Sequence, residues 1–167
     1  MRPTDVVLAH NKIVVQCKNS EAGVGHPVSL SEVVQQLEGL AKTQGISLAS
    51  NRTEDEAECS VLVYNMAVAR FQQRHMLQAS QLASRLLPLS PSFPSTFARK
   101  VLFLHCELSL ALHQPELAMV HAVKLEELLG DMSADQTEGL NLEQGRVLVL
   151  KARCSVMARM TKTLKKV

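Results

Sequence analysis

Apolar positions along the chain recur at spacings of three and four residues, and no stretch alternates steadily between apolar and polar. The first spacing places apolar side chains on one face of an α-helix, whereas a half-buried strand requires alternation. Stretches with the helical spacing begin near residues 5, 30, 54, 76, 96, 115 and 142. The pattern therefore predicts an all-α chain of about seven helices.

Several of these stretches carry helix boundary signals. Ser29 with Glu32, and Thr53 with Glu56, have the spacing of a capping box, in which each side chain bonds the backbone N–H of the other residue. Typical helix boundaries are a proline at the start of a stretch, a glycine at its end, and prolines that follow the end and cannot continue the helix. The residues that give such signals elsewhere are Gly45, Pro88, Pro91, Pro94, Pro115 and Gly130. The signals predict helices of moderate length joined by short connections.

The middle of the chain contains an internal repeat with an offset of 39 residues. A small residue is followed twelve positions later by Ala, four further on by Ala, and then by Leu; the two sets are Ala67, Ala79, Ala83 and Leu86, and Cys106, Ala118, Ala122 and Leu125. Small residues at these spacings let two antiparallel helices approach closely, as in tetratricopeptide repeats. We therefore assign repeat packing to Ala67, Ala79, Ala83, Cys106, Ala118 and Ala122.

These observations predict an antiparallel α-hairpin array, a tetratricopeptide-like α-solenoid that forms one domain over 1–167. The expected hairpins cover about 5–44, 54–87 and 96–129, and an unpaired helix covers about 142–158. Such units bury their apolar faces only by stacking on one another. The unpaired helix therefore indicates part of a longer array, or a partner chain that covers an apolar end.

The charge is distributed unevenly along the chain. The net charge of +2 divides into −5 for residues 1–145, which hold 11 Lys/Arg and 16 Asp/Glu, and +7 for residues 146–167, which hold seven Lys/Arg and no acid. A basic terminal helix is either a solvated surface or a site for phosphate or an acidic protein. Since RNA platforms combine basic residues with aromatic ones, and 146–167 has no aromatic residue, the sequence argues against direct RNA contact.

Catalytic and ligand-binding signatures are absent from the sequence. It has no P-loop, no GxGxxG, no GxSxG and no HExxH. His105 and Cys106 are adjacent, so they point to different sides of a helix, and a metal site or thiol dyad with His113 or His121 would need a tertiary coincidence. We therefore expect no catalytic residue, metal site, cofactor or small-molecule ligand, and no enzymatic activity.

The cysteines and the apolar runs bear on the compartment. Cys17, Cys59, Cys106 and Cys154 are widely spaced, which is typical of reduced thiols in a reducing compartment. The N-terminal residues lack the apolar stretch of a signal peptide, and no run reaches the roughly 18 apolar residues of a membrane span. These features predict a cytoplasmic chain without membrane contact, with the nucleus as a second compartment.

One family matches the order of these motifs. The stretch VLVYNMAVARFQQRHMLQASQLASRLL, with Tyr64, Asn65, Ala67 and Val68, resembles a helical hairpin of the family of the tenth subunit of the CNOT mRNA deadenylase complex. The first hairpin of that family is matched by DVVLAHNKIVVQC with LSEVVQQLEGL, and its next hairpin by FARKVLFLHCELSLALHQPELAMVHAVKLEELLG. The segment VLVLKARCSVMARMTKTLKK resembles its helix with a K-x-R stretch, here Lys151 and Arg153, so all the segments follow in the same order. The resemblance spans about residues 5–166.

The resemblance implies a non-catalytic scaffold that acts in mRNA deadenylation, mRNA turnover and translational repression. The implied partners are the large scaffold subunit and the eleventh subunit of that complex. A tetratricopeptide adaptor outside the complex, such as a chaperone or trafficking module, is the alternative. Lys100 and Asn65 stand at positions where chaperone-binding arrays hold a peptide carboxylate, but Leu104 replaces the Arg of that clamp.

A candidate interaction surface follows from the repeat geometry, because the first helix of each hairpin lines the concave side of such an array. The residues selected in this way are Val61, Tyr64, Phe71, Lys100, Phe103 and Glu107. For Tyr64, Phe71 and Phe103 the competing interpretation is packing in the core between hairpins.

Overall fold

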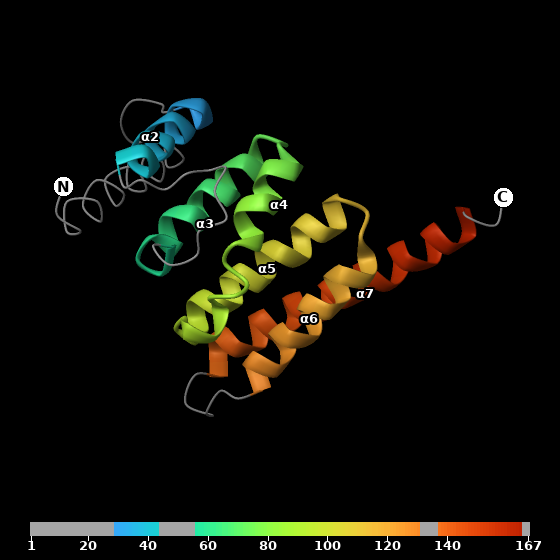
Figure 1. Cartoon of the computed structure of the whole chain (residues 1–167). Helices are drawn as coiled ribbons and strands as arrows, with labels where there is room; N and C mark the ends of the chain where they lie inside the picture. Colours follow the sequence, from blue (N-terminus) through green and yellow to red (C-terminus); the bar gives the residue numbers. More distant parts are fainter. Residues whose placement is uncertain (1–28, 44–55, 131–136, 165–167) are drawn as a thin grey trace. The chain divides into compact units, whose positions relative to one another are not determined.

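Every element of the described residues is a helix, in agreement with the predicted all-α class. The computed structural model describes residues 29–43, 56–130 and 137–164. Figure 1 shows the arrangement of the chain. The first predicted helix and the Thr53 half of one capping box lie outside the described residues. The helices group into two compact units, Met1–Leu86 and Leu87–Val167. The single domain over 1–167 stays a prediction.

The first unit contains α2 (Leu30–Thr43), α3 (Glu56–Gln72) and α4 (Met76–Ser84). The predicted capping box at the start of α2 is confirmed: the Glu32 N–H donates to Ser29 Oγ at 3.2 Å, and the Ser29 N–H donates to Glu32 Oε2 at 2.8 Å. Helix α2 buries one apolar face, which consists of Val33, Val34, Leu37 and Ala41. It packs on α3, and α3 packs on α4.

The second unit contains the short 3-10 helix η1 (Ser90–Ser92), then α5 (Ser95–Ala111), α6 (Pro115–Gly130) and α7 (Thr137–Leu164). Helix α6 begins at Pro115 and ends at Gly130, as the sequence predicts. It packs on α5 along one side and on α7 along another. Figure 1 shows the chain reversing direction between α5 and α6, and again between α6 and α7.

The turns that join α3 to α4 and α5 to α6 have the same geometry at an offset of 39 residues. Arg74 has φ 65° and His113 has φ 57°, the left-handed conformation that usually favours glycine. The next residue in each turn, His75 or Gln114, donates its N–H five residues back, at 2.9 and 2.8 Å. Arg74 and His113 donate theirs three residues back, at 3.0 and 3.1 Å. This pair of bonds is a Schellman motif, which closes both helices in the same way.

Helix α4 ends at Ser84, before the predicted end near Leu87. Pro88 explains this end, because a proline has no N–H to donate to the carbonyl four residues earlier and its ring clashes with that carbonyl. Arg85 and Leu86 instead donate to Leu82 and Ala83 in tighter turns, at 3.3 and 2.9 Å.

Helix α7 is longer than predicted. It has 28 residues, whereas the sequence pattern indicated a helix over about 142–158. The helix begins at Thr137, before the predicted start near residue 142, and continues through Asn141 and Gly145. The helix contains two glycines, Gly139 and Gly145, and each costs a helix interior only about 1 kcal/mol relative to alanine.

Candidate functional site

The six residues assigned to repeat packing lie at the centre of the two helix pairs. Ala67, Ala79 and Ala83 in the first unit, and Cys106, Ala118 and Ala122 in the second, all have 0% of their surface exposed. In the second unit the Cys106 thiol lies 3.6 Å from the carbonyl oxygen of Ala118, so the two backbones approach closely. Cys106, Ala118 and Ala122 form a cluster with Leu110 and with Leu150 and Cys154 of α7.

In the first unit, the predicted interaction residues differ in exposure. Val61 is 48% exposed, whereas Tyr64 and Phe71 are half-buried. Burial raises the pKa of the Tyr64 hydroxyl. Val61 therefore offers apolar surface to a partner, and the two aromatic side chains offer part of theirs.

In the second unit, the chain's own α7 already contacts two of the three predicted residues. The Arg146 guanidinium lies 5.1 Å from the centre of the Phe103 ring, a cation–π distance. The Arg153 guanidinium donates to Glu107 Oε1 at 2.7 Å. Phe103 also packs against the buried cluster around Cys106, as the core interpretation expected, and Lys100 remains exposed.

Two further ion pairs connect α7 with α5 and α6. Arg99 of α5 is buried and pairs with Glu143, and Lys151 donates to Glu126 of α6 at 2.8 Å. Three basic side chains of the terminal segment, Arg146, Lys151 and Arg153, therefore contact the second unit itself. This part of the basic segment therefore contacts α5 and α6 and is not only a solvated surface.

The outward face of α7 exposes several apolar side chains. Leu148 is 63% exposed, Val149 59%, Val156 56% and Met160 60%. They follow the side opposite Val147, Leu150 and Cys154, which are buried against α5 and α6. Single exposed apolar residues are ordinary, but a contiguous apolar face on one helix is typical of an interaction surface. The sequence analysis did not predict this face, because it chose interaction residues only from the first helices of the second and third predicted hairpins.

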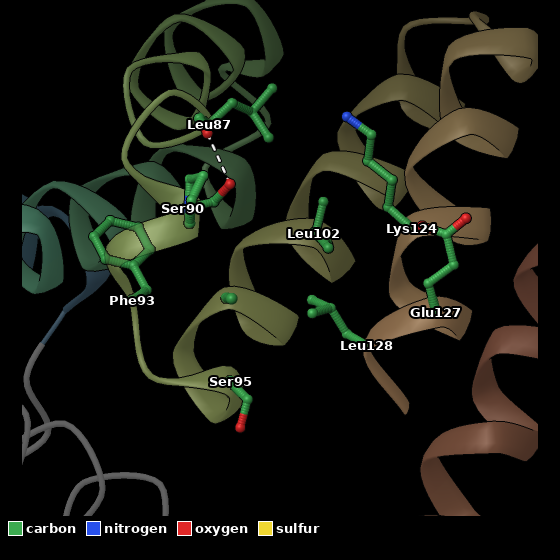
Figure 2. A pocket seen from close by; sticks show the side chains of 10 residues that line it. Leu87, Ser90, Phe93, Ser95, Leu102, Lys124, Glu127 and Leu128 are labelled. Carbon is green, nitrogen blue, oxygen red and sulfur yellow. Dashed lines mark hydrogen bonds between the residues drawn. The ribbon is translucent and has the colours of Figure 1, made fainter. Parts of the chain in front are cut away.

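A half-open cavity of about 490 Å³ lies in the second unit (Figure 2). Leu87, Ser90 and Phe93 line one side, Leu102 of α5 lies between, and Lys124, Glu127 and Leu128 of α6 line the other side. The Ser90 hydroxyl is engaged, since it donates to the Leu87 carbonyl at 2.8 Å. A cavity of this size with two charged groups at its edge fits the side chains of a binding partner.

Of the titratable residues that the sequence weighed for chemistry, His105, Cys106 and His121 are buried and His113 is exposed. The His105 and His121 rings lie 5.0 Å apart between centroids, and the His121 Nδ1 atom has no hydrogen-bond partner. Burial, with a smaller contribution from His105, lowers the pKa of His121 to about 4, and burial raises the pKa of Cys106 to about 12. Neither group is poised for proton transfer or nucleophilic attack at neutral pH. Within the described ranges, no three His, Cys, Asp or Glu side chains gather as a metal site.

No helix among the residues that the structure describes is both long enough and apolar enough to cross a membrane.

No protein-family model, curated protein or solved structure matches the chain.

Proposed function

We propose that the chain is a non-catalytic adaptor, built as a tetratricopeptide-like array of antiparallel α-hairpins, that binds other proteins. The observation that carries this proposal is the repetition of one helix pair: the α3–α4 and α5–α6 pairs share buried small residues and a Schellman turn at the same 39-residue offset. Repeated helix pairs present extended surfaces for other proteins. The buried thiols and histidines agree with a binding role.

The specific adaptor role follows from the sequence resemblance to the tenth-subunit family of the CNOT complex. In this proposal the chain joins the large scaffold subunit and the eleventh subunit, and it acts in mRNA deadenylation, turnover and translational repression without direct RNA contact. Its compartment is the cytoplasm, with the nucleus as a second location. The contacts with these partners are made through protein surfaces such as Val61 and the outward face of α7, which are apolar and exposed.

The experiment is affinity purification of the tagged chain from its own cells after nuclease treatment, with mass spectrometry of the recovered proteins. We expect the large deadenylase scaffold and its two nucleases to be recovered without RNA. A matched control is the tagged Leu125→Ala variant, because loss of a fully buried leucine disrupts the second unit and lowers specific recovery. Recovery of the wild-type chain without any deadenylase subunit would contradict the CNOT role.

A tetratricopeptide adaptor of the chaperone or trafficking type is the alternative, and the exposed Lys100 favours testing it. A Lys100→Glu variant reverses the charge that would hold a peptide carboxylate. If an acidic C-terminal peptide binds the wild-type chain and is lost from this variant, the alternative gains support. If the peptide binds neither protein, the clamp interpretation fails.

A further inference from the structure

The outward face of α7 repeats a pattern that α3 and α5 use to receive their second helices. In α5 the residues Leu102, Cys106 and Leu110 stand four apart, with the small one in the middle. All three are buried, and Cys106 and Leu110 share a cluster with Ala118 and Ala122 of α6. In this helix pair, a row of a large, a small and a large residue on the first helix, α5, packs against two alanines four positions apart on the second helix, α6.

The α3 helix has the corresponding row at the 39-residue offset. Val63 and Ala67 are fully buried there, and Phe71 is half-buried. The partner helix α4 again carries two fully buried alanines, Ala79 and Ala83. The same acceptor row and the same alanine pair thus occur twice in the chain.

In α7 the row is present without an occupant among the described residues. Leu148, Ala152 and Val156 stand four apart in the same large–small–large order. In contrast to the rows on α3 and α5, all three are exposed: Leu148 is 63% and Val156 56% exposed. The opposite side of α7 is already used, because Val147, Leu150 and Cys154 are buried against α5 and α6.

The charged side chains near the row on α7 indicate which kind of partner helix would bind there. Glu143 is the last acidic residue of the sequence, and the basic side chains Arg146, Lys151 and Arg153 of α7 are already engaged by Phe103, Glu126 and Glu107. Arg159 is exposed one turn after Val156, on the same side of the helix. A helix that docks on the row therefore meets the exposed Arg159, and an acidic side chain on that helix would steer and orient it.

We infer that the Leu148–Ala152–Val156 row is a docking site for a partner protein's amphipathic helix that carries two small residues four positions apart and acidic residues beside them. The inference rests on the adaptor function proposed above, but it does not depend on the identity of the complex. The small residues of the partner would fit around Ala152, as Ala118 and Ala122 fit around Cys106. Its carboxylates would lie beside Arg159.

The chain itself supplies a probe with this chemistry. A stapled synthetic helix of residues 114–130 contains Ala118 and Ala122, and its three Glu and one Lys give it a net charge of −2. One control peptide replaces both alanines with leucine, and a second replaces the three glutamates with glutamine. Binding of each labelled peptide to the full chain is measured by fluorescence anisotropy at low and high salt.

We expect the probe to bind the wild-type chain, and a Val156→Asp variant to bind it at least about tenfold more weakly, because the docked helix would bury an unpaired charge. The matched control is Val120→Asp, which places the same charge on an exposed position of α6, where Val120 is 51% exposed. Circular dichroism shows whether both variants remain folded. We also expect weaker binding of both control peptides, with the glutamine peptide less sensitive to salt.

Equal binding of the probe to the Val156→Asp variant, or equal binding of the leucine peptide, would overturn the docking site. Concentration-dependent self-association that Val156→Asp abolishes, without probe binding, would overturn it in favour of a second copy of the chain. The affinity purification separates this outcome from the wider function. If deadenylase subunits are recovered but the probe binds the wild-type chain and Val156→Asp equally, the adaptor function stands and this site fails. If the probe binds and Val156→Asp weakens it, but no deadenylase subunit is recovered, the site stands and the CNOT role fails.

Discussion

The α3–α4 and α5–α6 helix pairs share their contact residues but differ in almost everything outside them. At the 39-residue offset, the fully buried residues correspond, as do the left-handed turn residues Arg74 and His113. Other positions differ: the residue of α6 that corresponds to Leu82 of α4 is the buried His121. The two second helices also differ in length, because α4 ends at Ser84 whereas α6 continues to Gly130. The pair is therefore defined by a close helix contact and by one turn, and helix length and buried polarity vary around them.

The largest effect on stability is expected from truncating the buried leucines that correspond between the two pairs. Leu86 and Leu125 both have 0% of their surface exposed, so we expect Leu86→Ala and Leu125→Ala each to lower the free energy of unfolding by about 2–5 kcal/mol. Urea denaturation followed by far-UV circular dichroism measures the change. Leu77→Ala, at a position that is 70% exposed, is the control and should change stability by no more than about 0.5 kcal/mol. A large loss at only one of the two buried positions would break the correspondence.

Because His121 of α6 stands where α4 has Leu82, we expect the stability of the α5–α6 pair to depend on pH in a way that the α3–α4 pair does not. Because burial lowers the pKa of His121 to about 4, while an unfolded histidine titrates near about 6.5, the unfolded state binds more protons between these values. The stability that depends on neutral His121 is therefore present above about pH 6.5 and is lost as the pH falls towards about 4, by up to about 3 kcal/mol.

The matched variant for this prediction is His121→Leu, which copies Leu82 of the other pair. Unfolding free energies of the wild-type chain and of the variant are compared across the same pH range. We expect the difference between the two to grow in favour of the variant as the pH falls. A constant difference would mean that His121 does not become protonated on unfolding in this range.

Enlarging the small residues should affect both pairs by a similar, smaller amount. Ala79→Leu and Ala118→Leu insert three carbon atoms where no surface is exposed, and overpacking of this kind costs about 1–3 kcal/mol. Thermal unfolding by circular dichroism measures both. Ala152→Leu makes the same substitution at an exposed position and should leave the unfolding temperature nearly unchanged. If Ala79 tolerates leucine as well as Ala152 does, the first pair lacks the close contact of the second.

The smallest expected effect lies in the two turns. Glycine adopts a positive φ without the steric cost that other residues incur, so Arg74→Gly and His113→Gly should each stabilise the chain, by up to about 1 kcal/mol. Both positions are exposed, so no packing is lost. His113→Ala is the control, because alanine keeps the cost of the left-handed conformation. Chemical denaturation of the three variants checks the prediction, and destabilisation by both glycines would contradict it.

Much of the fold follows from local sequence patterns. The apolar spacing and the terminal signals at Ser29, Pro115 and Gly130 place helices close to where the structure has them. The offset of small residues also identified the buried positions, because close helix contact tolerates only small side chains. The two Schellman turns were not predicted, since Arg74 and His113 stand where a glycine would have signalled them. Their shared offset is the signal that could have found them.

The candidate surface was harder to predict, because a helix position indicates a face but not what covers it. Phe103 and Glu107 were selected from the face of a first helix, and tertiary contacts with Arg146 and Arg153 of α7 engage both. The exposed row on α7 was missed for the converse reason. Its pattern resembles a core, and only the three-dimensional arrangement shows that α5 and α6 lie on the other side of that helix.

The two thiols buried between α5, α6 and α7 make the second unit a reporter of its own opening. Burial raises the pKa of both Cys106 and Cys154, and neither side chain exposes more than 1% of its surface. A thiol-alkylating reagent at neutral pH therefore modifies them only when the helices separate. Peptide mass spectrometry of a timed alkylation would give the opening rate at each cysteine, and a helix that docks on α7 would slow both rates without touching either sulfur atom.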